Sequence, residues 1–243
     1  MGNTKSAVEE EYDMDELLEL TYLTRKQIII LYDRFQRILR EHQRPPHQPI
    51  PVELIAKEFE SLQVNPFTDR LLEIFSTETS TDGVTDFIFE DLLDMASVLS
   101  PRATEAAKAA YAFKVYDFDG DNQLGREDLT ELITRLTLED ISLHKLRKMT
   151  KGVSVIGESQ LPLPQPNTTK ERLRRLSQFR GSVIPNLVPK SRLSDDEIED
   201  IVNKILEDCD LDKDGYISLQ EFRHTLTKAP EFRESFSIRL WDD

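Results

Sequence analysis

The strongest constraint on the fold is a twelve-residue acidic pattern that occurs twice, as DFDGDNQLGRED at 117–128 and DLDKDGYISLQE at 210–221. Both stretches carry acidic residues at positions one, three, five and twelve. Hard cations such as Ca²⁺ take oxygen ligands, and an EF-hand loop supplies side-chain oxygens at this spacing, with a backbone carbonyl at position seven. The pattern therefore predicts two metal-binding loops, each placed between two helices.

The candidate metal ligands follow from these positions. In the first loop they are Asp117, Asp119, Asp121, the carbonyl of Gln123, and Asp128. In the second loop they are Asp210, Asp212, Asp214, the carbonyl of Tyr216, and Glu221. Because Asp is one methylene shorter than Glu, Asp128 reaches an ion with both oxygens less easily than Glu221 does. We therefore expect the second loop to be the tighter Ca²⁺ site, and the first to bind Ca²⁺ more weakly and to hold Mg²⁺.

Two further positions support the loop interpretation. Leu124 and Ile217 both stand at position eight, so we expect them to pair across a short two-stranded ladder. Asn122 stands where the second loop has Gly215, at a sharp turn, and Asn enters the left-handed backbone region more readily than most residues. Apolar residues at helical spacing flank both loops. The competing interpretation is a solvated acidic turn, which does not account for two full matches between helices.

Two more hands are expected upstream, because EF-hands usually pair to bury their apolar faces. An apolar helical stripe on both sides of STETSTDGVTDFIFED places Asp91 at position twelve and Phe87 at position eight. Counting back puts Ser80 and Val84 at positions one and five, so this hand lacks a ligand set. Further upstream, Thr24 and Gln27 form a capping-box pattern at a helix start. A Pro-rich connection follows that helix in place of an ion loop.

These features predict an all-α protein of two EF-hand pairs, with four helix–loop–helix units of which two are degenerate, short two-stranded loop ladders and a C-terminal helix. We expect an N-terminal lipid-anchor segment at 1–20 and an N-terminal lobe at 21–100. A C-terminal lobe at 101–243 would carry the two metal-binding hands. A flexible basic insert at 138–190 would interrupt that lobe.

Composition excludes several classes of protein. The net charge of -15 argues against nucleic-acid binding, because phosphates would be repelled. The single cysteine, Cys209, rules out an internal disulfide, so a reducing cytosol is the natural compartment. We find no membrane-spanning run, no signal-peptide core, no phosphate loop and no nucleophile motif, so a non-enzymatic protein is expected.

The insert departs from this acidic background. Between Lys145 and Arg192 the chain carries 11 Lys and Arg against two acidic residues. Three interpretations stay open: a disordered insertion, a basic contact with a membrane, and a pseudo-target that lies on the acidic groove of the same chain. Ser177 follows two arginines and is a candidate phosphorylation site, where a phosphate would weaken either contact.

The first residues, MGNTKS, fit the N-myristoylation pattern at Gly2. A single myristoyl chain binds membranes only marginally, with an association constant of about 10⁴ M⁻¹. A second contact is therefore required, and a membrane-protein partner would supply it. We expect a cytoplasmic protein that is peripheral at the plasma membrane.

The chain resembles the calcium- and integrin-binding protein family. The resembling pieces run in order along the chain: MGN, LTYLTRKQI, NPFTDRLLEIFS, EDLLDMASVLS, YAFKVYDFDGDNQLGREDL, ILEDCDLDKDGYISLQEF and KAPEFRESFSIRL. The resemblance implies two EF-hand lobes, no catalysis, and a hydrophobic groove that binds amphipathic helices of membrane proteins, either integrin α tails or segments of mechanotransduction channels. It also implies that the C-terminal segment at 230–241 occupies the groove until a target replaces it. The insert at 138–190 has no place in the family pattern.

Our leading hypothesis is a Ca²⁺-responsive adaptor, a monomer or weak dimer, whose ion loops order the lobe that binds a partner helix. One alternative is a calcineurin B-like regulatory subunit of a phosphatase or kinase, against which the Pro-rich segment at 42–51 counts. The other alternative is a Ca²⁺ buffer, which needs neither a groove-covering tail nor a lipid.

Overall fold

A computed structural model describes residues 7–79, 85–137, 193–229 and 231–241 of the chain. Several of the sites expected from the sequence lie outside these residues. They are Gly2, positions one and five of the second hand at Ser80 and Val84, and the insert with Ser177.

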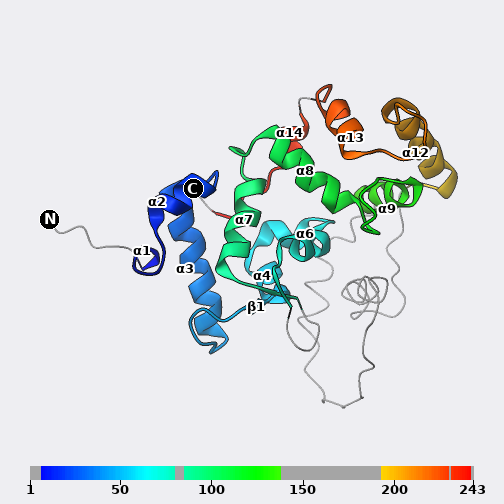
Figure 1. The fold of residues 1–243 in the computed structure, drawn as a ribbon. Coiled ribbons are helices and arrows are strands. Elements are labelled where there is room, and N and C mark those ends of the chain that lie inside the picture. Colours follow the sequence, from blue (N-terminus) through cyan, green and yellow to red (C-terminus); the bar gives the residue numbers. More distant parts are fainter. Residues whose placement is uncertain (1–6, 80–84, 138–192, 230, 242–243) are drawn as a thin grey trace, which may run out of the picture.

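The described chain is mostly helical, with one small antiparallel sheet (Figure 1). The elements of the first half are α1 (Val8–Glu11), α2 (Met14–Leu20), α3 (Arg25–Glu41), β1 (Ile50–Pro51), α4 (Val52–Glu58), α5 (Glu60–Val64), α6 (Thr68–Phe75), β2 (Glu78–Thr79), β3 (Thr85–Phe87) and α7 (Phe89–Leu99). Those of the second half are α8 (Glu105–Tyr116), α9 (Arg126–Leu136), α12 (Asp195–Cys209), α13 (Leu219–Leu226) and α14 (Phe232–Ser235). The all-α prediction is confirmed, with strands confined to the loops of the hands.

The two degenerate hands pair through their loops. Ile50 of β1 lies opposite Phe87 of β3, and β3 also pairs with β2, in the order β1-β3-β2. Phe87 therefore holds the ladder position that the sequence assigned to it. Helix α3 begins after Thr24 with the expected capping box, in which Thr24 and Gln27 bond each other's backbone amides.

A large hydrophobic core fills the first lobe, to which several helices contribute aromatic or aliphatic side chains. Its most buried large members include Phe35, Phe59, Phe87, Ile28, Leu31, Ile55 and Leu92. Burying such side chains contributes roughly 1.5–3 kcal/mol each, so this cluster supplies much of the driving force for folding. The cluster also contains two residues from the far end of the chain, Leu240 and Trp241.

The N-terminal helices pack against the same core. Val8 in α1 is fully buried and Met14 in α2 is 5% exposed. An ion pair of 2.5 Å between Glu9 and Arg25 links α1 to the start of α3. Residues from Val8 onward, which the sequence grouped with the lipid-anchor segment, therefore contact the first lobe in this structure.

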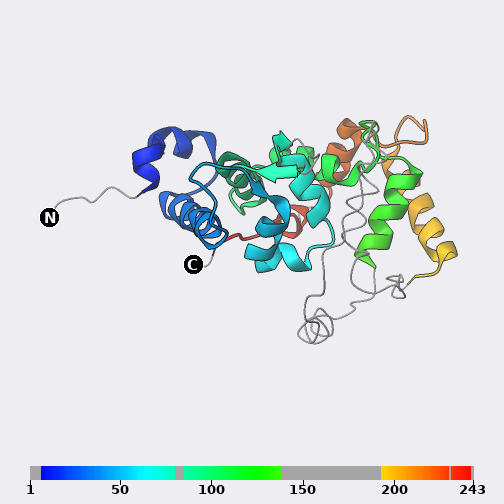
Figure 2. The same cartoon turned by 90° about the horizontal axis from the view of Figure 1, so that it is seen from below.

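The second lobe has its own smaller core, at the opposite end of the molecule from α1 and α2 (Figure 2). This core joins the helices of the third and fourth hands, α8 and α9 with α12 and α13. Its buried members are Phe113, Leu124, Leu129, Ile198, Val202 and Ile217. Leu136, the last residue of α9, is 59% exposed.

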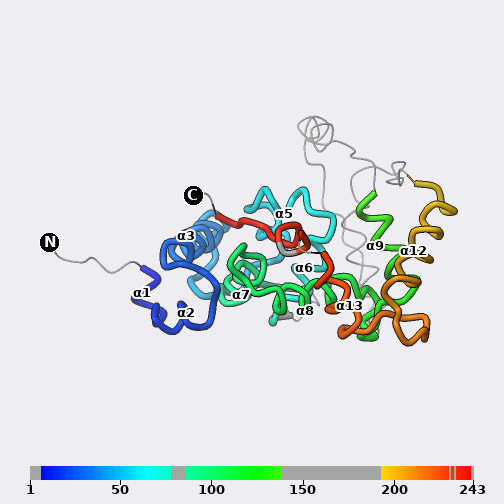
Figure 3. Tube along the Cα trace, turned by 90° about the horizontal axis from the view of Figure 1, so that it is seen from above, coloured from blue at the N-terminus to red at the C-terminus, as the bar shows by residue number. Residues whose placement is uncertain are grey.

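The C-terminal tail crosses from the second lobe back to the first (Figure 3). Its helix α14 spans only Phe232–Ser235, and an extended segment, red in Figure 3, then runs toward α3. Along the way the amide of Ile238 donates to the carbonyl of Leu99, and the Ser61 hydroxyl donates to the carbonyl of Arg239. No helix among the described residues is long and apolar enough to cross a membrane.

Candidate metal centres

The first loop brings carboxylates from three of its predicted ligands together. Carboxylate oxygens of Asp117, Asp119 and Asp128 all lie within 4.8 Å of one another. Asp117 and Asp128 are 6% and 4% exposed, whereas Asp119 faces solvent. Asp121, the remaining acidic residue of this loop, is exposed and its carboxylate accepts from the Gln123 amide at 2.8 Å.

The second loop gathers a slightly different set. Here the carboxylates within 4.8 Å of one another belong to Asp210, Asp212 and Asp214. Glu221 is 8% exposed and lies outside that cluster. Its carboxylate accepts from the Leu211 amide at 2.8 Å and from the Ser218 amide at 2.9 Å.

The two loops share one scaffold of hydrogen bonds, which explains why the twelve-residue spacing matters. In each loop the carboxylate at position one accepts from the backbone amides at positions four, five and six. The carboxylate at position three accepts from the amide at five, and the carboxylate at five from the amide at seven. Each carboxylate thus shapes the turn that carries the next one, so the acidic residues are structural as well as ligating.

Position twelve differs between the loops in its electrostatics. Burial raises the pKa of Asp128 above its ordinary value, although the Gly125 and Phe118 amides oppose the shift. The hydrogen bond from the Ser218 amide instead lowers the pKa of Glu221. In the first loop the pKa of Asp117 is also raised by burial. At position twelve, keeping the carboxylate ionised without a cation is therefore more costly in the first loop than in the second.

These features fit a hard divalent cation in both loops. The clustered carboxylates repel one another, and a cation with oxygen preference relieves that repulsion together with the desolvation of the buried members, Asp117, Asp128 and Asp210. The donor set contains oxygen only, which suits Ca²⁺ and Mg²⁺ rather than softer metals. The carbonyls of Gln123 and Tyr216 are the predicted position-seven ligands, and their own amides are held by Asp121 and Asp214.

The sharp turns of the loops use left-handed backbone at two places. Asn122 and Gly215 at position six have φ of 65° and 91°, as the sequence comparison between the loops predicted. Position four is also left-handed, with φ of 75° at Gly120 and 62° at Lys213. At position four, the first loop has a glycine, Gly120, which is typical of left-handed backbone. The second loop has Lys213 there, a residue type that does not indicate such a turn.

The two loops are joined directly. Leu124 and Ile217 form the expected antiparallel bridge. A second contact was not foreseen: a side chain at Gly125 would place its Cβ 3.2 Å from the ring of Tyr216. Gly125 therefore lets Tyr216 from the second loop lie against the first loop.

The second hand retains its position-twelve carboxylate but uses it differently. Asp91 is 2% exposed, and its carboxylate accepts from the Thr77 hydroxyl at 2.8 Å and from the Ile88 amide at 3.0 Å. These donors satisfy the carboxylate from within the protein. Asp91 therefore forms hydrogen bonds within the loop of a hand that the sequence predicts to be without metal.

Contacts from the first lobe to the third hand were missed by the sequence reasoning. Asp69 and Arg70 of α6 bind residues of α8 and α9, at separations of 44 to 66 residues along the chain. Nothing in the local pattern around Asp69 and Arg70 distinguishes them from ordinary surface charges.

Comparison with known proteins agrees with this geometry. A family model described as an EF-hand domain pair matches residues 88–136, and an EF hand domain model matches residues 201–229. Among the relatives is calcium and integrin-binding family member 2 of Drosophila melanogaster, 31% identical over 247 residues, covering 99% of this chain and 100% of the relative. The proteins of the same name from Mus musculus and Homo sapiens are 29% and 28% identical over 245 residues, with the same coverage.

The loops, their pairing and the length of these matches lead to one assignment. EF-hand domains of this kind imply Ca²⁺ binding. The matched relatives extend across both lobes and the tail, so the likeness is not confined to the ion loops. The chain belongs to the calcium and integrin-binding family of EF-hand proteins.

Proposed function

We propose that this chain is a Ca²⁺- and Mg²⁺-binding adaptor that holds an amphipathic helix from the cytoplasmic segment of a membrane protein. The observation that carries the proposal is the C-terminal tail, whose apolar residues Leu240 and Trp241 are 1% and 7% exposed within the core of the first lobe. An apolar surface that needs such a cover is a binding site for any apolar helix that competes with the tail.

The polar contacts of the tail support the proposal that a guest helix can take its place. Among the described residues, its bonds to the body of the protein use the tail backbone at Ile238, Arg239 and Phe236, and Lys108 of α8 also donates to the Ser237 hydroxyl. Backbone contacts of this kind do not depend on the identity of the side chains. A guest helix with similar apolar residues would therefore fill the same place, and the tail would act as its competitor.

The names of the relatives suggest the partner. They are called calcium and integrin-binding family members, so the membrane-proximal segment of an integrin α tail is the first candidate. Segments of mechanotransduction channels, which the resemblance to the family implies but the names do not mention, are the second. The net charge of -15 favours partners with basic flanks and disfavours nucleic acid.

The ions have separate roles in this proposal. Loop 210–221, with Glu221 at position twelve, is the Ca²⁺ site. Loop 117–128, with the shorter Asp128, binds Ca²⁺ more weakly and holds Mg²⁺ in a resting cell. Calorimetry on Glu221→Gln and Asp128→Asn tests this difference, and an equal loss of Ca²⁺ affinity in both variants would refute it.

A myristoyl group on Gly2 would keep the adaptor at the plasma membrane. Val8, six positions later, is fully buried, so the lipid would lie within about 20 Å of the first lobe, given a span of roughly 3.3–3.6 Å per residue. Liposome sedimentation of the lipidated chain against Gly2→Ala tests this part of the proposal separately. Equal sedimentation of both would remove the lipid anchor.

Two other functions make different predictions. A Ca²⁺ buffer would show little change in apolar-dye fluorescence with Ca²⁺, whereas an adaptor exposes or rearranges its groove. A phosphatase or kinase subunit would bind its catalytic chain in preference to an integrin segment. The tail that covers the first lobe favours the adaptor over the buffer.

The direct test uses the full chain and a synthetic peptide of a membrane-proximal integrin α segment. Trp241 is the single tryptophan of the chain, so its fluorescence reports whether the tail leaves its place. We expect the peptide to bind and to shift Trp241 emission to the red in Ca²⁺, with a scrambled peptide of equal composition as the control. Equal binding of both peptides, or binding without a change at Trp241, would contradict the proposal.

A further inference from the structure

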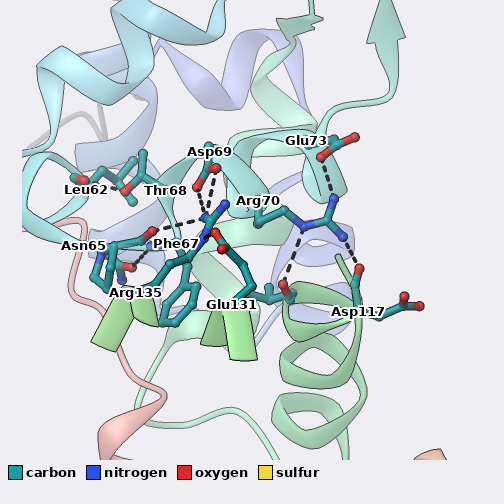
Figure 4. Close-up of polar contacts among 12 residues, drawn as sticks. Leu62, Asn65, Phe67, Thr68, Asp69, Arg70, Glu73, Asp117, Glu131 and Arg135 are labelled. Atoms are coloured by element: carbon teal, nitrogen blue, oxygen red, sulfur yellow. Dashed lines mark hydrogen bonds and ion pairs between the residues drawn. The ribbon is translucent and has the colours of Figure 1, made fainter. Parts of the chain in front are cut away.

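Two neighbouring residues of α6 bind opposite helices of the third hand (Figure 4). Arg70 donates to the carbonyl of Lys114 at 3.1 Å and to the carbonyl of Asp117, where α8 passes into the ion loop. Asp69 accepts both of its bonds from Arg135 of α9, at 2.8 and 2.9 Å. One short helix of the first lobe thus holds the entering and the exiting helix of the ion-binding hand.

The contact of Arg70 completes the end of α8. The last carbonyls of a helix have no partner within the helix, and a cation near them is also favoured by the helix dipole. Arg70 is 8% exposed, and its charge is balanced by an ion pair of 2.6 Å with Glu73. A buried guanidinium with a partner and several carbonyl acceptors is a specific contact, and its loss would leave those carbonyls unsatisfied.

Phe118, the second residue of loop 117–128, lies close to both Arg70 and Arg135. The guanidinium of Arg70 is 5.7 Å from the ring centre of Phe118, and that of Arg135 is 4.6 Å from it. The amide of Phe118 in turn donates to the Asp128 carboxylate at 2.8 Å. Arg70 therefore contacts position one of the loop directly, at Asp117, and position twelve through Phe118, whose amide binds Asp128.

The fourth hand differs at the equivalent place. Leu211 stands at position two of that loop, as Phe118 does in the third, and its side chain is 59% exposed. The loop at 210–221 therefore provides an internal reference with the same scaffold of hydrogen bonds.

We propose that Asp69 and Arg70 are positioning residues for the divalent cation of loop 117–128, because they set the angle between α8 and α9 and hold the loop in its ion-binding shape. The inference rests on the proposed ion binding at that loop. By thermodynamic reciprocity, an ion in the loop strengthens the packing of the two lobes by the same factor as that packing strengthens ion binding.

The test uses the full chain with Glu221→Gln, so that Ca²⁺ or Mg²⁺ titration by calorimetry reports on loop 117–128. The added change is the pair Arg70→Met and Glu73→Gln, which removes the contacts while leaving the net charge unaltered. We expect about a tenfold loss of affinity, within the usual range of coupling between sites. The matched control is Arg37→Met with Glu58→Gln, another Arg–Glu pair of the first lobe, for which we expect no change.

Hydrogen exchange supplies a second readout that a purely structural role would not alter. In the parent chain we expect ion binding to slow amide exchange in α6, and in the Arg70 variant we expect that response to disappear. Should the Arg70 variant fail to fold by circular dichroism, Arg135→Met with Glu131→Gln removes the other contact, again at constant net charge.

The outcomes separate the two proposals. A flat titration in the Glu221→Gln parent would overturn ion binding at loop 117–128, and with it this inference. If the Glu221→Gln parent binds the ion, and the Arg70 or Arg135 variants bind it as tightly as the Arg37 control does, only the proposed role of α6 is overturned.

Discussion

Leu124 and Ile217 exchange a reciprocal pair of backbone hydrogen bonds, each 3.0 Å long, at position eight of the two ion loops. Their side chains are 1% and 2% exposed and belong to the core of the second lobe. The bridge therefore joins the two candidate metal centres to each other and to the hydrophobic core. We therefore expect a change in the geometry of one loop to reach the other through this pair.

Shortening Ile217 should weaken both loops. Ile217→Ala leaves a cavity beside Leu124, and we expect a loss of about 2–5 kcal/mol in the free energy of unfolding, as is typical for a buried isoleucine. Calorimetry should show lower Ca²⁺ affinity at both loops. Leu211→Ala, in the same loop but on an exposed side chain, is the control, with an expected change within about 0.5 kcal/mol. Weaker binding at one loop alone would show that the bridge does not couple them.

The left-handed turn at position six can be tested by exchanging its residues. Gly215 has φ of 91°, and a Cβ added there would meet no atom within 4 Å. The cost of Gly215→Ala is therefore one of backbone conformation, about 1–2 kcal/mol. Gly215→Asn should cost less, because Asn122 occupies the same place in the other loop at φ of 65°. Urea unfolding in chelator measures both variants, and equal losses for Ala and Asn would contradict this explanation of Asn122.

Burial of Asp91 should give the ion-free protein a specific dependence on pH. Because burial raises the pKa of Asp91 in the folded state, its ionised form opposes folding at neutral pH. That cost is relieved as the pH falls through the raised pKa. Relative to Asp91→Asn, the free energy of unfolding of the parent should therefore increase between neutral pH and the unfolded value of about 3.9.

The comparison has a defined negative result. Urea unfolding of both chains in chelator across this pH range gives the difference directly. A constant difference would mean that Asp91 titrates alike in the folded and unfolded chains. Thr77→Val, which removes one donor to the Asp91 carboxylate, should raise the pKa further and enlarge the effect.

Lys108 should secure the C-terminal tail. It is fully buried, and its ammonium donates to the carbonyl of Phe236 at 3.0 Å and to the hydroxyl of Ser237. Lys108→Met keeps the length of the side chain but removes these bonds, so we expect a looser tail and greater quenching of Trp241 fluorescence by acrylamide. Lys114→Met, on the exposed side of the same helix, is the control. Unchanged quenching in Lys108→Met would exclude this role.

The parts of the structure that could be predicted from the order of the amino acids are those whose contacts are local. The acidic residues of 117–128 and 210–221 form their hydrogen bonds within each loop, so their spacing along the chain is also their arrangement in space. The capping box at Thr24 and the left-handed Asn122 follow from neighbours a few residues away. The pairing of Leu124 with Ile217 also followed, because two loops of the same pattern meet at the same position.

Contacts between distant segments could not be predicted in this way, because they form only when the helices pack together. Arg70 meets the carbonyl of Asp117 across 47 residues, and Lys108 meets that of Phe236 across 128. Backbone carbonyls have no sequence signature, so a charged side chain that binds them looks like any other charge on a helix. Their partners are set by how the helices pack, which depends on the shape of the whole core rather than on any spacing along the chain.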